Sequence, residues 1–210
     1  FKGPVDAVFH LAAQSRIPPS FSDPYLTHCS NVNATANVLE FARRTQTKVI
    51  FAGTSCAYHD SMANPYAFTK NIGEQYCRLY ADLYGVSVAI ARFFNVYGPN
   101  EDHKEGQSSP YHIFSKQLES EGKIKLFEGS KEFLRDFVSV DEVIKQKLYH
   151  IENSESGMYD VGTGEPKSFY DVAIEICGSD NNIDWVPMPD NLKEHYQKYT
   201  CAIMNKKMPD

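Results

Sequence analysis

The sequence predicts an α/β fold, in which a doubly wound parallel sheet is followed by a smaller second part. Two observations carry this prediction. In the first half of the chain, short β-branched and apolar runs alternate with longer segments of helical periodicity, in the order β-α-β-α-β. That order is typical of parallel strands joined by right-handed crossover helices. After Asn95 the alternation ends, and a polar segment punctuated by glycine and proline begins.

The elements of the first half follow from their residue patterns. Residues 5–10 (VDAVFH) form a short apolar run, which suits a buried parallel strand. Residues 24–45 have apolar side chains at helical spacing, and residues 48–53 (KVIFAG) are a second β-branched strand. Residues 65–84 are helical again and are followed by a glycine, the expected C-cap. Residues 86–94 (VSVAIARFF) make a third strand.

The sequence of the second half predicts fewer and shorter helices and strands than that of the first half. Helices are expected at residues 111–121, 140–152 and 168–177, with a short strand at residues 123–127. The end of the chain reads as polar and rich in loops, without internal repeats or low-complexity tracts. We therefore expect a smaller cap that accompanies the sheet.

Composition excludes several classes of protein. The 210 residues carry 21 Lys and Arg against 27 Asp and Glu, a net charge of −6, and the basic residues are scattered. This pattern disfavours nucleic acid or an anionic membrane as the main partner. No segment approaches the ~20 apolar residues of a membrane span. The spacing of the five cysteines and of the histidines fits no metal site, so we expect no metal, and reduced thiols in a cytoplasmic protein.

Tyr66 and Lys70 are the main catalytic candidates. They lie four residues apart at the start of a predicted helix, so they share one helical face. A cation beside a phenol favours the phenolate and lowers the pKa of the tyrosine, which can then take a proton from an alcohol. Thr54 and Asn95 end the neighbouring strands and place further polar groups at the same edge of the sheet. The alternative is a surface tyrosine beside a solvated lysine.

Six segments of the chain form a recognisable series. They are HLAAQS (10–15), NVNAT (31–35), FAGTS (51–55), NPYAFTK (64–70), ARFFNVYGP (91–99) and RDFVSVDEV (135–143). In this order they resemble the extended short-chain dehydrogenases/reductases that act on nucleotide sugars. The resemblance implies a Rossmann-like fold. Residues 1–98 would be a dinucleotide-binding domain that lacks its N-terminal part. Residues 99–210 would be mainly a substrate-binding cap, with some segments that return to the sheet.

The resemblance implies a role for each matching residue. Tyr66 would act as acid and base, and Lys70 would tune it and bind the nicotinamide ribose. Thr54 would hydrogen-bond the substrate hydroxyl, with Ser55 as the fallback. The cofactor, NAD or NADP, would also contact Leu11, Ala12, Ala13, Gln14, Ser15, Asn31, Phe94 and Val96. Some of these residues could instead serve packing, and Asn31 could be a helix-start residue.

The segment from Asn95 to Arg135 resembles the ADP-L-glycero-D-manno-heptose 6-epimerase branch of that family, through FFNVYGPNEDHKEG and LFEGSKEFLRDFV. By this resemblance the sugar nucleotide would contact Ser55, Asn95, Phe127, Glu128, Gly129, Ser130, Arg135 and Tyr196. Lys104 matches a second proton-transfer residue, although its acidic neighbours also suit a solvated loop lysine. Arg135 is better supported, because a guanidinium can grip a diphosphate through two hydrogen bonds.

The chain departs from the family pattern at three points. Its twelve glycines nowhere form the G-x-x-G-x-x-G loop that cradles a dinucleotide pyrophosphate at a helix N-terminus. The interval between Thr54 and Tyr66 is shorter than in the family. The first half also reads more like members that act on hexoses than like heptose epimerases. We therefore expect weak binding of NAD or NADP by the 210 residues themselves, and these departures leave the sugar open.

The sequence thus predicts an NAD(P)-dependent epimerase of a nucleoside-diphosphate sugar, which works by transient oxidation and return of hydride and forms a homo-oligomer. The alternatives are a 4-epimerase or 4,6-dehydratase of the same family, or a non-catalytic module that binds sugar nucleotides. A dehydratase would need an acidic pair after the catalytic hydroxyl, whereas Ser55 and Cys56 follow Thr54.

Overall fold

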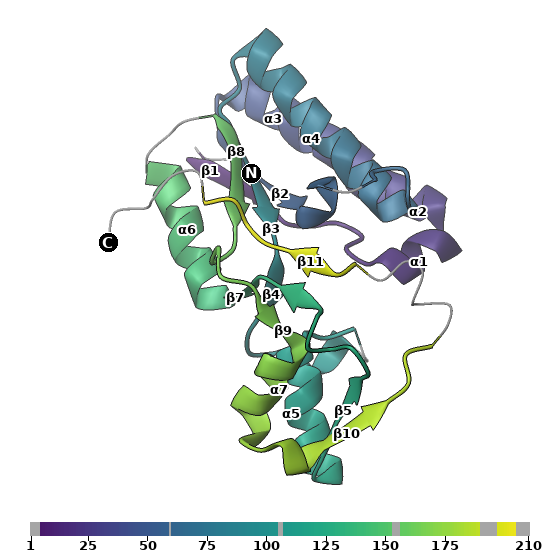
Figure 1. Ribbon diagram of the computed structural model, residues 1–210. Coiled ribbons are helices and arrows are strands. Elements are labelled where there is room, and N and C mark those ends of the chain that lie inside the picture. Colours follow the sequence, from purple (N-terminus) through teal and green to yellow (C-terminus); the bar gives the residue numbers. More distant parts are fainter. Residues whose placement is uncertain (1–4, 59, 105–106, 153–155, 190–196, 205–210) are drawn as a thin grey trace. The chain divides into compact units, whose positions relative to one another are not determined.

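A computed structural model describes residues 5–58, 60–104, 107–152, 156–189 and 197–204 of the chain (Figure 1). These residues form two compact units. One contains the residues up to Phe93 together with Lys145–Val161, and the other contains Phe94–Ile144 and Gly162–Met204. Each unit has its own hydrophobic core.

The first unit is built on a four-stranded parallel sheet with the order β1-β2-β3-β8. The strands are β1 (Ala7–His10), β2 (Lys48–Thr54), β3 (Val88–Phe93) and β8 (Gly157–Val161). The first three confirm the predicted strands, and the parallel sheet confirms the predicted α/β class. The sequence pattern does not predict β8, because five residues of mixed polarity carry too little periodicity.

The helices of the first unit connect these strands. They are α1 (Ile17–Ser22), α2 (Pro24–His28), the π-helical turn η1 (Cys29–Asn33), α3 (Ala34–Thr45), the 3₁₀ turn η2 (Ser55–Tyr58) and α4 (Pro65–Tyr84). Together α2, η1 and α3 form the uninterrupted helical segment that the sequence predicts. Its pattern does not reveal α1, which is short and contains two prolines.

Helix α4 has the bounds that the sequence predicts. Asn64 caps its start, where the side chain accepts a hydrogen bond from the backbone N of Ala67 at 2.8 Å. Pro65 occupies the first helical position, where its fixed φ suits the helix and no N–H is needed. Gly85 ends the helix in the left-handed region, with φ of 65°.

Helices α3 and α4 lie side by side and pack with β2 and β3 (Figure 1). The core between them contains Leu39, Ala42, Val49, Phe51, Cys77, Val86, Val88 and Ile90. Gly73 of α4 lies against the buried Phe51, since a Cβ added at Gly73 would be 2.7 Å from Cζ of the ring. Only glycine therefore lets α4 approach β2 this closely.

The second unit consists of short elements. Its helices are η3 (Asp102–Lys104), α5 (Pro110–Glu121), α7 (Phe169–Cys177) and η4 (Asp180–Asn182). Its strands are β4 (Asn95–Tyr97), β5 (Ile124–Phe127), β6 (Leu134–Arg135), β7 (Phe137–Ser139), β9 (Lys167–Ser168), β10 (Ile183–Val186) and β11 (Tyr199–Thr200). The predicted α5, β5 and α7 are confirmed. The expectation of a loop-rich end is wrong where β10 and β11 form.

The core of the second unit lies between α5, α7 and the pair β5–β10. It contains Phe114, Ile124, Leu126, Phe137, Val172, Ala173 and Ile183. Helix α6 (Val140–Glu152), which the sequence predicts with these bounds, begins in the second unit and continues into the first.

Two further facts bear on the class of protein. No helix in the described part of the chain is both long and apolar enough to cross a bilayer. The five cysteines are free thiols, as the sequence predicts.

Candidate active site

Helix α4 places Tyr66 and Lys70 one turn apart near its N-terminus. Tyr66 is the second helical residue, and its backbone N donates to the buried hydroxyl of Ser20 at 3.2 Å. The positive end of the helix dipole favours a negative charge at this position, which a phenolate would supply. Lys70 is 5% exposed, so its ammonium lies inside the unit rather than in solvent. The alternative of a solvated surface lysine is therefore wrong.

Thr54 ends β2 and is buried beside Tyr66. Burial raises the pKa of the Tyr66 phenol, while a side-chain hydrogen bond with Thr54 acts to lower it. The charges of Cys56 and Arg16 make smaller contributions of opposite sign. The net direction is opposite to the lowering expected from Lys70, because removal of the phenol from water outweighs the neighbouring groups.

The ammonium of Lys70 lies over the ring of Phe51, with Nζ 4.5 Å from the ring centroid. Burial lowers the pKa of Lys70 to about 8, and the carboxylate charge of Glu74 opposes this shift only in part. Lys70 therefore changes its charge close to neutral pH, where a solvated lysine would stay fully protonated. Such a group can donate hydrogen bonds to a ligand and can respond to a proton transfer beside it.

The loop after β1, residues 11–15, is held by Asn31 of η1. The Asn31 side chain accepts from the backbone N of Gln14 at 2.8 Å and donates to the Gln14 carbonyl at 3.0 Å. It also donates to the hydroxyl of Thr69 on α4 at 3.0 Å. Asn31 thus connects this loop with helix α4. Leu11, Ala12 and Ser15 are exposed, and Ala13 and Gln14 are half-buried.

His10 is buried at the end of β1, with Nε2 2.9 Å from the hydroxyl of Thr35. That hydroxyl donates to the carbonyl of Asn31 at 2.6 Å, so its oxygen must accept from His10. The neutral imidazole therefore carries its proton on Nε2. Burial lowers the pKa of His10, and the charge of Lys70 lowers it further, so His10 is neutral at pH 7.

The residues predicted to contact substrate lie mostly in the second unit. Asn95 opens β4, where its backbone N donates to the carbonyl of Asp136 at 2.9 Å. A turn at the end of β5 contains Phe127, Glu128, Gly129 and Ser130, of which Ser130 is buried. Of the predicted cofactor contacts, Phe94 and Val96 also belong to this unit. Tyr196 lies outside the described residues. Ser55, in η2 of the first unit, is half-buried.

Arg135 is a buried residue of β6. Its guanidinium donates to the carbonyl oxygens of Leu134 and Gln197 and lies over the ring of Phe169. These contacts fix the position of the side chain within its own unit. A role in gripping a diphosphate stays a prediction.

Lys104 is half-buried in η3, with Nζ 3.0 Å from Oε2 of Glu101. Burial acts to raise the pKa of Glu101, but hydrogen bonds from Ser109, Lys104 and Gly98 outweigh it and hold that pKa at about 2. The Glu101 carboxylate thereby connects Gly98, Lys104 and Ser109 by hydrogen bonds. The proton-transfer role of Lys104 stays a prediction.

Asp136, fully buried beside Arg135, joins three segments of the second unit. Its Oδ1 accepts from the backbone N and the hydroxyl of Thr163, at 2.8 and 2.7 Å. Its Oδ2 accepts from the backbone N of Gly164 and of Ala202, at 2.9 and 3.0 Å. Asp136 is therefore a structural centre of this unit, and its carboxylate is occupied by backbone and hydroxyl donors.

Three groups that contact Lys70 or its neighbour Glu74 escape sequence reasoning. They are the ring of Phe51 and the ion pair formed by Glu74 and Arg92. The spacing of Lys70 and Glu74 along α4 is a visible signal for a charge pair. The position of Arg92 requires knowledge of how β3 runs past α4, which no local pattern supplies.

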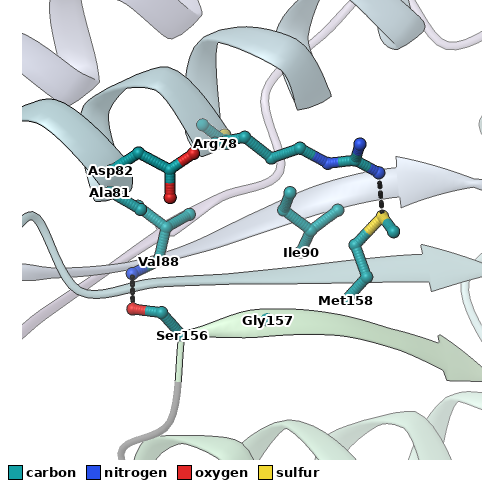
Figure 2. Close-up of a pocket in the computed structure, with 9 residues that line it drawn as sticks. Arg78, Ala81, Asp82, Val88, Ile90, Ser156, Gly157 and Met158 are labelled. Carbon is teal, nitrogen blue, oxygen red and sulfur yellow. Dashed lines mark hydrogen bonds between the residues drawn. The ribbon is translucent and has the colours of Figure 1, made fainter.

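A cavity elsewhere in the first unit does not coincide with these residues. A cavity of about 190 Å³ lies between α4 and β8, lined by Arg78, Asp82 and Met158 among others (Figure 2). None of the predicted site residues lines it. Among the residues that the structure describes, no three His, Cys, Asp or Glu side chains gather where a metal ion would be held.

Comparison with known proteins defines the family. Residues 1–162 match the NAD dependent epimerase/dehydratase family. Over 223 positions the chain is 33% identical to the ADP-L-glycero-D-manno-heptose-6-epimerase of Alkalilimnicola ehrlichii, a match that covers 97% of this chain and 69% of the relative. The chain therefore belongs to the NAD dependent epimerase/dehydratase family, and the predicted family resemblance is confirmed.

Two solved structures share the fold. One is the ADP-L-glycero-D-manno-heptose-6-epimerase of Helicobacter pylori, with a TM-score of 0.80 and 27% identity, covering 95% of this chain and 64% of that one. The other is the UDP-N-acetylglucosamine 4-epimerase of Methanobrevibacter ruminantium M1, with a TM-score of 0.85. Its identity is 23%, over 98% of this chain and 71% of that one, so the likeness concerns the fold alone.

Proposed function

We propose that this chain supplies most of an NAD- or NADP-dependent epimerase that acts on a nucleoside-diphosphate sugar. The observation that carries the proposal is the grouping of Thr54, Tyr66 and Lys70 at the end of β2 and the start of α4. A phenol at a helix N-terminus, hydrogen-bonded to a hydroxyl and followed by a buried ammonium, suits proton transfer at an alcohol carbon.

The proposed reaction inverts one sugar carbon by transient oxidation. A bound nicotinamide cofactor would supply the hydride chemistry, namely oxidation of that carbon and reduction of the resulting carbonyl from its opposite face. Tyr66 takes the hydroxyl proton as the carbonyl forms and returns it as the alcohol is restored. Thr54 holds the same oxygen by a hydrogen bond and so keeps it within reach of the phenol. Lys70 supplies a positive charge beside the phenolate, which lowers the cost of holding that charge in a buried site.

The residues present fit the nicotinamide half of such a cofactor. The Tyr66 phenol and the Lys70 ammonium are donors of the kind that ribose hydroxyls accept, and Leu11 offers an exposed apolar contact at the end of β1. Asn31 would act by holding the loop Leu11–Ser15 in place, since its side-chain amide is already engaged by Gln14 and Thr69.

The second unit, in this proposal, is the substrate-binding cap. Arg135 would bind the diphosphate, and the turn Phe127–Ser130 together with Asn95 and Tyr196 would contact the rest of the sugar nucleotide. Lys104 would be the second proton-transfer residue. The heptose-6-epimerase relative at 33% identity favours an ADP-heptose as substrate over a UDP-hexose. Ser55 and Cys56, which follow Thr54, disfavour a 4,6-dehydratase because neither is a carboxylate.

We also propose that the protein is a cytoplasmic homo-oligomer. Free cysteines support a reducing compartment. An apolar stripe on the exposed side of α4 supports self-association, because its residues recur at helical spacing and retain substantial exposure. The stripe consists of Phe68, Tyr76, Leu79 and Leu83.

The test is Tyr66→Phe, made in the natural reading frame that contains this chain. Interconversion of the two ADP-heptose epimers is followed by NMR, with Tyr84→Phe as the matched control at the exposed end of the same helix. We expect Tyr66→Phe to lower kcat by about 10²–10⁴-fold, because the hydroxyl alone transfers the proton. The control should keep wild-type kcat.

Unchanged kcat in Tyr66→Phe would overturn the assignment of Tyr66. A wild-type protein that binds a sugar nucleotide but converts none, with or without added cofactor, would instead support the non-catalytic binding module.

A further inference from the structure

Glu74 and Arg92 form a buried ion pair in the first unit. Arg92 Nη2 lies 2.7 Å from Glu74 Oε2, and Nε lies 3.2 Å from both carboxylate oxygens. Glu74 is 1% exposed. Removing two charges from water costs free energy that their mutual attraction often fails to recover, so a buried ion pair is weak evidence for a purely stabilising role.

The ion pair lies close to Lys70 and to the end of β2 that carries Thr54. Glu74 follows Lys70 by one turn of α4, and both side chains are buried. A Cβ added at Gly53 would lie 2.8 Å from Glu74 Oε1 and 3.1 Å from Arg92 Cγ. The ion pair therefore rests against the backbone of the residue before Thr54, and the glycine there makes room for it.

The titratable groups that act on Lys70, or on its neighbour Glu74, come from three elements. They are Glu74 and Cys77 of α4, His10 of β1 and, through its ion pair with Glu74, Arg92 of β3. His10 is neutral at pH 7, and burial raises the pKa of the Cys77 thiol to about 12, so neither offers Lys70 a negative charge. Within this set, the carboxylate of Glu74 is the counter-charge to the ammonium.

Arg92 competes for that carboxylate. Its guanidinium donates hydrogen bonds to both carboxylate oxygens of Glu74 and lies over the ring of Tyr58, 4.9 Å from the centroid. Tyr58 donates in turn to Asp160 of β8 at 2.8 and 2.9 Å. Arg92 is thereby fixed between α4 and η2. Because Arg92 partly neutralises the Glu74 carboxylate, its fixed position also sets how strongly Glu74 attracts the Lys70 ammonium.

We propose that the Glu74–Arg92 pair is a positioning element for Lys70, in which Glu74 holds the buried ammonium in its charged form and Arg92 limits how strongly it does so. The inference rests on the proposed function only for the statement that Lys70 takes part in catalysis. The electrostatic relationship belongs to the first unit and can be measured without turnover.

The test is an NMR titration of the Lys70 side chain in protein labelled with ¹³C-lysine, between pH 6 and pH 11. Loss of the Cε resonance in Lys70→Met assigns the signal. In Glu74→Gln the midpoint should fall by about one pH unit, because the counter-charge is removed and Arg92 is left as an unpaired cation. In Arg92→Met it should rise by a comparable amount, because Glu74 then has Lys70 as its remaining cationic partner.

The Lys70 midpoint is expected to shift in opposite directions in Glu74→Gln and Arg92→Met, and this difference distinguishes the proposed role from a purely structural one. Loosening of the core would admit water and move both midpoints upward, toward the ordinary value of lysine. Glu40→Gln is the matched control, since Glu40 pairs with Arg43 and Arg44 on the surface of α3 and should leave the Lys70 midpoint unchanged. If Glu74→Gln does not fold, Glu74→Asp draws the carboxylate back by one methylene and should lower the midpoint by a smaller amount.

A midpoint that stays constant or rises in the glutamate variant would overturn the proposal. So would shifts of the same sign in the glutamate and arginine variants. Failure of the proposed function has a different signature, namely full turnover in Tyr66→Phe, and leaves the titration shifts in place.

Discussion

Lys70 and Phe51 meet as a buried ammonium over an aromatic ring, with Nζ 4.5 Å from the centroid. The same ring lies against Gly73, one turn further along α4. The face of an aromatic ring attracts a cation, so this contact offsets part of the cost of burying the lysine. Core packing at Gly73 therefore helps to set the position of a proposed catalytic charge.

The first prediction concerns the stability cost of Lys70. Its pKa is lowered to about 8 in the folded protein, from an ordinary value of 10.5. Below pH 8 the lysine is charged in both folded and unfolded states, and the full cost of burial is present. Between the two pKa values only the unfolded state keeps the proton, so the free energy of unfolding rises with pH. We expect Lys70→Met to stabilise the protein at pH 7 by about 1–3 kcal/mol.

Urea unfolding of wild type and Lys70→Met at pH 7 and pH 10 measures this effect. The advantage of the variant should shrink as the pH rises through 8 and approach zero above about 10.5, where the wild-type lysine is neutral in both states. A difference that is independent of pH would show that packing, rather than charge, separates the two proteins.

The second prediction concerns Gly73. Alanine is the better helix former by about 1 kcal/mol, so an exposed glycine in α4 would gain stability from the change. At Gly73, however, the added methyl would lie 2.7 Å from the buried ring of Phe51. We expect Gly73→Ala to destabilise the protein by about 1–3 kcal/mol, as overpacked cores do. The measurement is urea unfolding, with Gln75→Ala on the exposed face of α4 as a control that keeps wild-type stability.

The third prediction concerns Arg135. If its guanidinium holds a diphosphate, it binds substrate and transition state alike, so Arg135→Ala should raise KM much more than it lowers kcat. The assay is the epimerase reaction, with Lys123→Ala as a control, since Lys123 pairs with Asp184 at the surface of the same unit. Equal KM in Arg135→Ala and wild type would show that the side chain serves only its contacts with Leu134, Gln197 and Phe169.

The fourth prediction concerns binding of the cofactor by the 210 residues themselves. A dinucleotide pyrophosphate is held mainly by backbone N–H groups of a glycine-rich turn and the helix after it, and the sequence contains no such motif. Calorimetric titration with NAD and with NADP should therefore give weak or undetectable binding. Micromolar affinity would show that the dinucleotide site is built elsewhere in the chain.

Sequence reasoning succeeds where local signals are strong. Helix α4 is predicted residue for residue because Asn64 and Pro65 start it and Gly85 stops it. Strand β8 escapes prediction because its membership of the sheet depends on pairing with β3, as Gly157 does with Ala89, rather than on its own pattern. The three-residue strands β4 and β7 are too short for any periodicity to show.

The candidate site likewise contains some features that the sequence predicts and others that depend on the tertiary structure. The spacing of Tyr66 and Lys70 predicts their shared helical face, and the end of β2 predicts the place of Thr54. The direction of the Tyr66 pKa could not be predicted, because it depends on how deeply the phenol is buried. The Glu74–Arg92 pair could not be predicted either, since its partners come from α4 and β3.

The carboxylate of Asp136 has a consequence for the order in which the protein can fold during synthesis. Its four hydrogen bonds come from Thr163, Gly164 and Ala202, so the last of them is available only after residue 202 has left the ribosome. Until then a carboxylate that is buried in the finished protein has to remain solvated. The second unit therefore completes this set of hydrogen bonds only after residue 202 has been translated.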